Sequence, residues 1–460
     1  MPHTERQGGT PTLSLTSLVC LIIANMIGAG VFTTSGFALS DLGSANRVMA
    51  AWVVGGIIAL SGALSYAGLV RYMTESGGEY LFLSRVIHPV AGFIAGWVSL
   101  LAGFTGAIAF AARAFETYAF PTRPEWLPSG VAASAMVLLA AVVHGVRVET
   151  GAAFQNFIVF LKVAMLVLFL AFAASVALDA GPAAPAPTVM PFSVATFAGS
   201  LVWISLSYSG FNAAVYVAGE AKDAQRNAPR ALLIGTLIVT VLYVALNAAF
   251  VYLPPFEAVV GKADVAAAAA QAIGGDAAAL GIRAVTVVAL ITSVFSLVMA
   301  GPRVYARMAE DGVFPQFFRF GGGSAPTAAI AAQALLAVGV IALSDLRGLL
   351  SYLGFTLSLS GALTVASLFV IARRHGRQAV SVWGYPFTPL LYVVATLVLA
   401  GIAGRRQPVE LLTAVITIVS GSVVYYGFGL NKGLRAPGSR LEAEHVPGSR
   451  LQAPGSGRNL

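Results

Sequence analysis

The sequence predicts an all-α integral membrane protein with about twelve transmembrane helices. The chain has 460 residues, of which 58% are hydrophobic and only 10% charged, and its mean hydropathy is +0.83. Apolar runs long enough to cross a hydrocarbon core of about 30 Å recur along nearly its whole length. Most of the 27 Lys and Arg residues fall in alternate segments between these runs, which predicts a multi-pass protein of the cell inner (plasma) membrane with both termini cytosolic.

The expected spans, in chain order, are 13–39, 48–72, 89–117, 130–146, 153–178, 193–218, 230–254, 281–306, 327–344, 348–372, 387–404 and 409–429. The first run carries polar and Gly interruptions and lacks a small-residue cleavage site, so we interpret it as a retained span and not a signal peptide. Together the spans form one transmembrane domain, 13–430, between a cytosolic amino-terminal segment, 1–12, and a cytosolic tail, 431–460.

Three segments outside the spans have distinctive compositions. Residues 179–191 are rich in Pro and Ala, which favours an extended outer loop. Residues 261–281 are Ala-rich and moderately polar, which predicts a short helix across the outer face. The tail repeats a Pro-, Gly- and Ser-rich unit, which is typical of disorder.

Two spans are interrupted at comparable positions. Gly28-Ala29-Gly30 lies near the middle of the first span, and Ser209-Gly210 with Asn212 interrupts the sixth. Each glycine weakens a helix by about 1 kcal/mol. The spans then divide into two five-helix halves of opposite orientation, 13–178 and 193–372, followed by two extra helices within 387–429. Paired interruptions in inverted repeats indicate the substrate site of a transporter.

Such breaks offer two kinds of binding group. Half-helix N-termini present free N–H groups to an anion, and carbonyls left unpaired by the break accept hydrogen bonds from a cation. Together they suit the carboxylate and ammonium groups of an α-amino acid. The alternative is that Gly28 and Gly30 serve only close packing between helices.

Lys162 lies about halfway along the fifth span, far from either of its ends. A central lysine costs roughly 2.5–3.5 kcal/mol to insert, so it normally faces the protein interior. We expect its ammonium to fill a cavity against carbonyls of the broken first span and to replace a bound sodium ion. Two alternatives are that the side chain snorkels to the membrane surface and that it carries a proton.

Among the 19 carboxylates, only Glu116 is placed near a span interior, where we expect an ion pair with Arg113. A cationic substrate would therefore lack a counter-ion, which favours a neutral zwitterion. The sequence has no Cys/His metal cluster, no Ser-His-Asp set and no phosphate loop, so no enzyme activity, metal or cofactor is predicted. The cations form no continuous patch, which argues against nucleic acid. Asn247 is expected to form an interhelical hydrogen bond.

Four motifs occur in the order found in one family. NMIGAGVF at 25–32 resembles the first-span motif of the amino acid-polyamine-organocation (APC) permeases. ESGGEYLFL at 75–83, GEAKDAQRNAPRAL at 219–232 and GPRVYARMAEDGVFP at 301–315 are similar to three loops of that family. The resemblance runs from about residue 14 to 430 and implies a LeuT-type fold.

The resemblance also implies roles for individual residues. The N–H groups of Ala29 and Gly30 would bind the substrate carboxylate, and the carbonyls of Met26, Leu206 and Ser209 would bind its ammonium. The rest of the predicted substrate site comprises Ile27, Gly28, Gly210 and Asn212, and Lys162 matches a lysine of sodium-independent members.

Two positions depart from relatives. Leu206 stands where many have an aromatic that closes over the substrate, and Asn212 stands where an arginine-exchanging branch has an acid, which agrees with a neutral substrate. The cytosolic motif residues are expected to be gate and topology elements: Arg226, Arg303, Arg307 and Asp311.

The sequence thus predicts a sodium-independent carrier of neutral L-amino acids that works by alternating access. Exchange and proton symport are both compatible with it, so protons are a candidate second partner besides the substrate and membrane lipid. The alternative is a cationic amino acid or polyamine permease. The preferred amino acid and the oligomeric state are not predicted.

Overall fold

The computed structural model describes residues 13–145, 152–180, 191–319 and 326–427. Within these ranges the chain is almost entirely helical and contains no β-strand. Among the described residues, eight helical spans are long and apolar enough to cross a membrane, with the broken first span and the three consecutive helices of Pro89–Ala119 each counted as one. Four shorter apolar helices occupy the remaining predicted spans, so the multi-pass helical fold predicted from sequence is confirmed.

The first half of the described chain contains α1 (Leu15–Met26), α2 (Gly30–Leu42), α3 (Ala45–Tyr72), α4 (Gly78–Val86), α5 (Pro89–Val98), the π-helix η1 (Ser99–Gly106), α6 (Ala107–Ala119), α7 (Val131–Gly145) and α8 (Ala152–Ala180). The second half begins with α9 (Val194–Ser207), the 3₁₀-helix η2 (Ala213–Glu220), α10 (Ala224–Tyr252), α11 (Phe256–Val259) and α12 (Val265–Glu310). It ends with η3 (Gln316–Phe318), α13 (Thr327–Leu343), α14 (Leu346–His375), η4 (Arg377–Ala379), α15 (Phe387–Ala403) and α16 (Pro408–Gly427).

Side-chain caps fix the starts of several spans. The Ser14 hydroxyl accepts a hydrogen bond from the Ser17 amide at α1, and Ser193 caps α9 in the same way. The Asp345 carboxylate accepts from the Gly348 amide at α14. Each cap satisfies one amide that has no partner within its helix.

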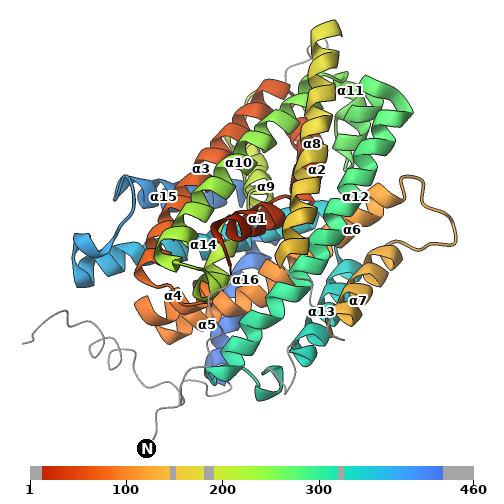
Figure 1. Cartoon of the computed structure of the whole chain (residues 1–460). Helices are drawn as coiled ribbons and strands as arrows, with labels where there is room; N and C mark the ends of the chain where they lie inside the picture. The colour runs from red at the N-terminus through yellow and green to blue at the C-terminus, as the bar shows by residue number, and fades with distance from the viewer. Residues whose placement is uncertain (1–12, 146–151, 181–190, 320–325, 428–460) are drawn as a thin grey trace, which may run out of the picture.

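Helix α1 lies near the middle of the bundle (Figure 1), where it packs against α10 and α8. Helices α7 and α13 pack side by side at one edge of the view, and α15 lies at the opposite edge. Peripheral helices expose large apolar side chains, such as Leu168 on α8 and Leu397 on α15. An apolar exterior of this kind suits a protein surrounded by lipid.

Three sequence predictions need adjustment. The third span is not one α-helix, because the π-helix η1 separates α5 from α6. The helix expected within 261–281 is not separate: it is the first part of α12, which bends at Gly275 with φ 66° and ψ −159°. Helix α8 continues to Ala180, so the predicted loop 179–191 begins later than expected.

Other predicted segments lie outside the described residues. These are the remainder of that loop up to residue 190, the amino-terminal segment 1–12 and the tail 431–460.

Candidate functional site

The first span breaks where the sequence predicts. Helix α1 ends at Met26, and Ile27 has non-helical backbone angles of φ −76° and ψ 82°. The Gly28 amide turns back to donate to the Met26 carbonyl at 2.8 Å, and α2 begins at Gly30 with Ala29 as its N-cap residue. The first amides of a helix have no intrahelical acceptor, so this break presents N–H groups at a helix N-terminus.

The sixth span breaks in a complementary way. Helix α9 ends at Ser207, and the chain turns through residues 208–212 before η2 begins at Ala213. Gly210 has φ +96°, a conformation that L side chains rarely adopt. The turn therefore requires glycine at this position.

The two breaks touch each other through their glycines. A Cβ atom on Gly30 would lie 2.4 Å from the Ser207 Oγ and 2.7 Å from the Ser207 Cα. A Cβ atom on Gly210 would lie 2.8 Å from the Asn25 carbonyl carbon and oxygen. Close packing is thus one role of these glycines, and it brings the two sets of backbone groups into one site.

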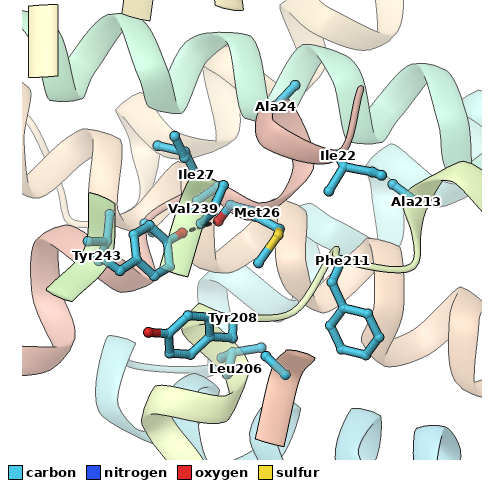
Figure 2. Packing of buried hydrophobic residues seen from close by; sticks show 14 of the residues in the cluster. Ile22, Ala24, Met26, Ile27, Leu206, Tyr208, Phe211, Ala213, Val239 and Tyr243 are labelled. Carbon is cyan, nitrogen blue, oxygen red and sulfur yellow. Dashed lines mark hydrogen bonds between the residues drawn. The ribbon is translucent and has the colours of Figure 1, made fainter. Parts of the chain in front are cut away.

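Protein donors already occupy two of the carbonyls expected to bind ammonium. The Met26 carbonyl accepts from the Gly28 amide and from the Tyr243 hydroxyl, which Figure 2 shows pointing at it. The Leu206 carbonyl accepts from the Ser209 amide at 2.9 Å. Among the described residues, no donor to the Ser209 carbonyl is found, so this carbonyl is the most available of the three.

Lys162 lies in the protein interior, with only 2% of the residue exposed. Its Nζ donates to the Ile27 carbonyl at 2.9 Å, so a side chain of α8 bonds to the broken segment. The burial is incompatible with snorkelling to the membrane surface. The Lys162 amino group therefore occupies a carbonyl freed by the break.

A cavity of about 600 Å³ runs from the two breaks to one end of the bundle. Its wall includes these members of the predicted site: Met26, Gly28, Ala29, Gly30, Leu206, Ser209, Gly210 and Asn212. Ile27 and Lys162 are not part of the wall and lie behind it. The cavity reaches Leu13 and the exposed residues Glu220 and Arg307, and we call this the Leu13 end.

The opposite end, which we call the Asp41 end, is closed by contacts across α2. The Arg347 guanidinium on α14 pairs with Asp41 at 2.6 Å and lies 4.9 Å from the Trp203 ring centroid on α9. The Tyr118 hydroxyl on α6 donates to the Phe32 carbonyl at 2.5 Å. The structure thus has the site accessible from one end and closed at the other.

The sequence interpretation missed a buried carboxylate in the cavity wall. Glu79 is only 7% exposed, and its Oε1 accepts from the Tyr66 hydroxyl at 2.5 Å and the Asn212 amide at 3.1 Å. The statement that Glu116 alone lies near the interior was therefore wrong. The segment was interpreted as a loop, but Gly77 and Gly78 have φ +144° and +57°, and the chain turns there into α4, which carries Glu79 inward.

The remaining predicted residues lie apart from the breaks. Glu116 pairs with Arg113 at 3.5 Å as predicted and also accepts from the Gly130 amide at 2.9 Å. Asn247 forms the predicted interhelical hydrogen bond, accepting from Ser35 at 2.5 Å.

The cytosolic motif residues lie toward the Leu13 end. Arg307 pairs with Asp311 at 3.4 Å, Arg303 donates to the Met299 carbonyl at 2.6 Å, and Arg226 lies 4.0 Å from Asp223. Arg303 and Arg307 also line the far part of the cavity, so they surround its opening and not the breaks.

Comparison with known proteins matches this sequence to one family. The sequence profile of a family described as amino acid permease matches residues 13–423. The serine/threonine exchanger SteT of Bacillus subtilis (strain 168) is 25% identical over 94% of this chain and 99% of its own length. The b(0,+)-type amino acid transporter 1 of Mus musculus is 26% identical over 92% of this chain and 90% of its own. A methylthioribose transporter of Bacillus subtilis (strain 168) is 25% identical over 90% of this chain and 92% of its own.

Proposed function

The chain belongs to the amino acid permease family, whose members are transporters and not enzymes, and from this premise we propose that it carries neutral α-amino acids without sodium. The observation that carries the proposal is the pair of touching breaks with Lys162 behind them. The relatives include carriers named for serine and threonine, for amino acids in general and for methylthioribose, so the family alone leaves the substrate open.

The backbone groups at the breaks support a zwitterionic substrate. The carboxylate is assigned to the amides of Ala29 and Gly30, where the N-terminus of α2 adds a positive partial charge. The ammonium is assigned first to the Ser209 carbonyl. The carbonyls of Met26 and Leu206 would contribute after their protein donors move, because both already accept hydrogen bonds.

Lys162 supports independence from sodium. Its ammonium donates to the Ile27 carbonyl, so it supplies a positive charge where a freed carbonyl would otherwise attract a cation. A lysine is a fixed part of the chain and does not travel with the substrate. Transport would then draw on the amino acid gradient or on protons.

The asymmetry of the cavity supports alternating access. The Leu13 end, predicted to be cytosolic, is open to the breaks, and the Asp41 end is closed by the Arg347 and Tyr118 contacts. The complementary state would open the Asp41 end and close the Leu13 end around the same site.

The test is uptake of radiolabelled alanine, serine and leucine into proteoliposomes containing the purified protein. Counterflow, with unlabelled amino acid inside, detects exchange regardless of any ion gradient. We expect saturable uptake that is unchanged when choline replaces sodium. Strict dependence on sodium, or saturable transport only of amines that lack a carboxylate, would overturn the proposal.

A cationic amino acid or polyamine is the second candidate, because Glu79 gives the cavity wall a carboxylate that the sequence interpretation had not placed there. A carboxylate that serves as counter-ion normally turns its oxygens toward the bound cation. The Glu79 Oε1 instead accepts hydrogen bonds from two neutral side chains, which argues against this role. Competition by arginine and by putrescine against labelled alanine discriminates: strong competition would favour this candidate.

A further inference from the structure

Glu79 is a buried carboxyl group with neutral partners at the edge of the substrate cavity. Both of its hydrogen bonds, from the Tyr66 hydroxyl and the Asn212 amide, converge on Oε1. Within the described part of the chain, no Lys, Arg or His side chain forms an ion pair with it. Burying an ionised carboxylate without a counter-charge is costly, so such a group tends to take up a proton.

The charged groups on the surrounding elements have other partners. On α4 itself, Arg85 pairs with Glu75 at 2.5 Å, and Tyr80 donates to Asp311 at 2.8 Å. From α3, Arg71 donates to the Ser381 carbonyl at 3.0 Å, and from α14, Arg374 donates to the Val86 carbonyl at 2.7 Å.

The titratable groups that do face Glu79 are hydroxyls. These are Tyr66 on α3, Tyr216 on η2 and Tyr392 on α15. The two histidines on neighbouring elements have other contacts: His375 ends α14 against Tyr72, and His88 precedes α5 with its Nδ1 accepting from the Val90 amide.

Asn212 connects this carboxyl group to the substrate site. It is the N-cap residue of η2 and lies two residues after Gly210, which packs on the Asn25 carbonyl of the first break. Its amide also lies 3.4 Å from the Tyr216 hydroxyl. A change in the charge of Glu79 therefore acts directly on the second broken segment.

Resting on the proposed function, we propose that Glu79 is a proton-binding site and that closure of the Leu13 end requires its protonated form. In the present conformation the cavity reaches Glu79, so water can partly hydrate the carboxylate. Closing the Leu13 end removes that water. An ionised Glu79 would then be buried with only neutral partners, whereas the neutral acid carries no charge to solvate.

The proposed step binds and releases one proton at Glu79. One proton binds a Glu79 carboxylate oxygen from the water in the cavity, and the same O–H bond breaks when the proton returns to water. Burial raises the pKa of the Glu79 carboxyl, and the hydrogen bonds from Tyr66 and Asn212 lower it by less. A raised pKa brings the titration of Glu79 closer to neutral pH, as the proposed proton site requires.

The experiment measures amino acid counterflow in proteoliposomes with equal pH on both sides. We expect the exchange rate of the unmodified protein to fall by about tenfold per pH unit above its midpoint, as for release of a single proton. Glu79→Gln, which mimics the neutral acid, should give a rate that no longer depends on pH in this range. Glu75→Gln is the matched control, because Glu75 lies on the same segment but is about half exposed and paired with Arg85, and it should keep the original profile.

A second variant tests the inference even if Glu79→Gln misfolds. Tyr66→Phe removes one hydrogen bond to the carboxylate, so the midpoint should move to higher pH. A pH-independent rate in the unmodified protein, or an unchanged profile in Glu79→Gln, would overturn the inference. So would loss of competition by arginine in Glu79→Gln without a change of pH profile, because Glu79 would then be a counter-ion for substrate.

Failure of the proposed function is a separate result. If no amino acid exchanges at any pH, infrared difference spectra of the purified protein still report whether a buried carboxyl group titrates. A protonated-carboxyl band that disappears on raising the pH, and that is missing in Glu79→Gln, supports the proton site. Its absence from the unmodified protein contradicts it.

Discussion

Replacing Lys162 by methionine should stop transport without unfolding the protein. Methionine keeps most of the length of the side chain but removes the hydrogen bond from Nζ to the Ile27 carbonyl, which is 2.9 Å long. A hydrogen bond from a charged donor contributes about 1.5–3 kcal/mol. If that energy holds the broken segment in its binding geometry, its loss lowers the population of the competent state by about 10- to 150-fold.

The stability of Lys162→Met should be close to that of the unmodified protein. Lys162 is 2% exposed, and removing a buried charge relieves its desolvation, whereas the Ile27 carbonyl left without a donor costs about 1–3 kcal/mol. These effects oppose each other, so we expect a melting temperature close to that of the unmodified protein. A general folding defect would lower both stability and transport.

The assay is counterflow of labelled alanine in proteoliposomes, combined with the melting temperature in detergent. Lys262→Met is the control, because Lys262 is exposed near the Asp41 end. Transport by Lys162→Met within about twofold of the unmodified protein would refute the reasoning, since the hydrogen bond would then contribute less than about 0.5 kcal/mol. A large fall in melting temperature with lost transport would instead make the lysine a structural residue.

Three further perturbations test other parts of the structure. Gly30→Ala should abolish exchange and lower the melting temperature, because its Cβ would lie 2.4 Å from the Ser207 Oγ. The control, Gly339→Ala on α13, should be tolerated because no atom lies within 4 Å of the added Cβ. Exchange by Gly30→Ala at the original rate would contradict the close contact. Arg347→Gln removes a half-exposed ion pair worth about 1 kcal/mol. A cysteine placed at Ser358 in the cavity wall, in a Cys20→Ser background, should then react about fivefold faster with a thiol reagent added from the Asp41 side. An unchanged labelling rate would show that this pair does not hold the Asp41 end closed. Glu79→Gln should have the same melting temperature as the unmodified protein at acid pH and an increasingly higher one as the pH rises. A raised pKa means that folding favours the protonated carboxyl, and this stability is lost as Glu79 ionises. Parallel plots of melting temperature against pH for the two proteins would show that Glu79 keeps one charge state.

The spans and both breaks could be predicted because their signals are local. A run of apolar residues needs no knowledge of its neighbours to be recognised as a span, and Gly28 and Gly30 weaken a helix wherever it packs. Lys162 was informative for the same reason, since a charge within an apolar run must find a partner. Its partner, the Ile27 carbonyl, follows from the proximity of α8 to the first break.

The parts that were missed depend on how the chain folds back on itself. Glu79 follows two glycines in what looked like a polar loop, and only the reversal at Gly77 and Gly78 brings it under Asn212. Two consecutive glycines before an apolar stretch are a signal that could have predicted such a reversal. The bond from Tyr243 to Met26 leaves no comparable pattern, because it joins residues of distant helices, and no pattern predicted the π-helix Ser99–Gly106.

Side chains from two different helices hold successive carbonyls of the first break. Tyr243 on α10 bonds to the Met26 carbonyl, and Lys162 on α8 bonds to the Ile27 carbonyl. On the far side of the break, Gly30 rests against Ser207 at the end of α9. The amides assigned to the substrate carboxylate therefore cannot keep their positions if α8, α9 or α10 moves relative to α1.

In the proposed function, substrate binding and helix motion are in this way linked through the backbone. The carboxylate and ammonium groups are common to all α-amino acids, so their binding at the proposed site would drive the conformational change without selecting a side chain. We assign selection to side chains in the cavity wall, such as those of Leu206 and Phe211. Substitutions at Leu206 or Phe211 should therefore change which amino acid is carried, whereas substitutions at Lys162 or Tyr243 should change how fast every substrate is carried.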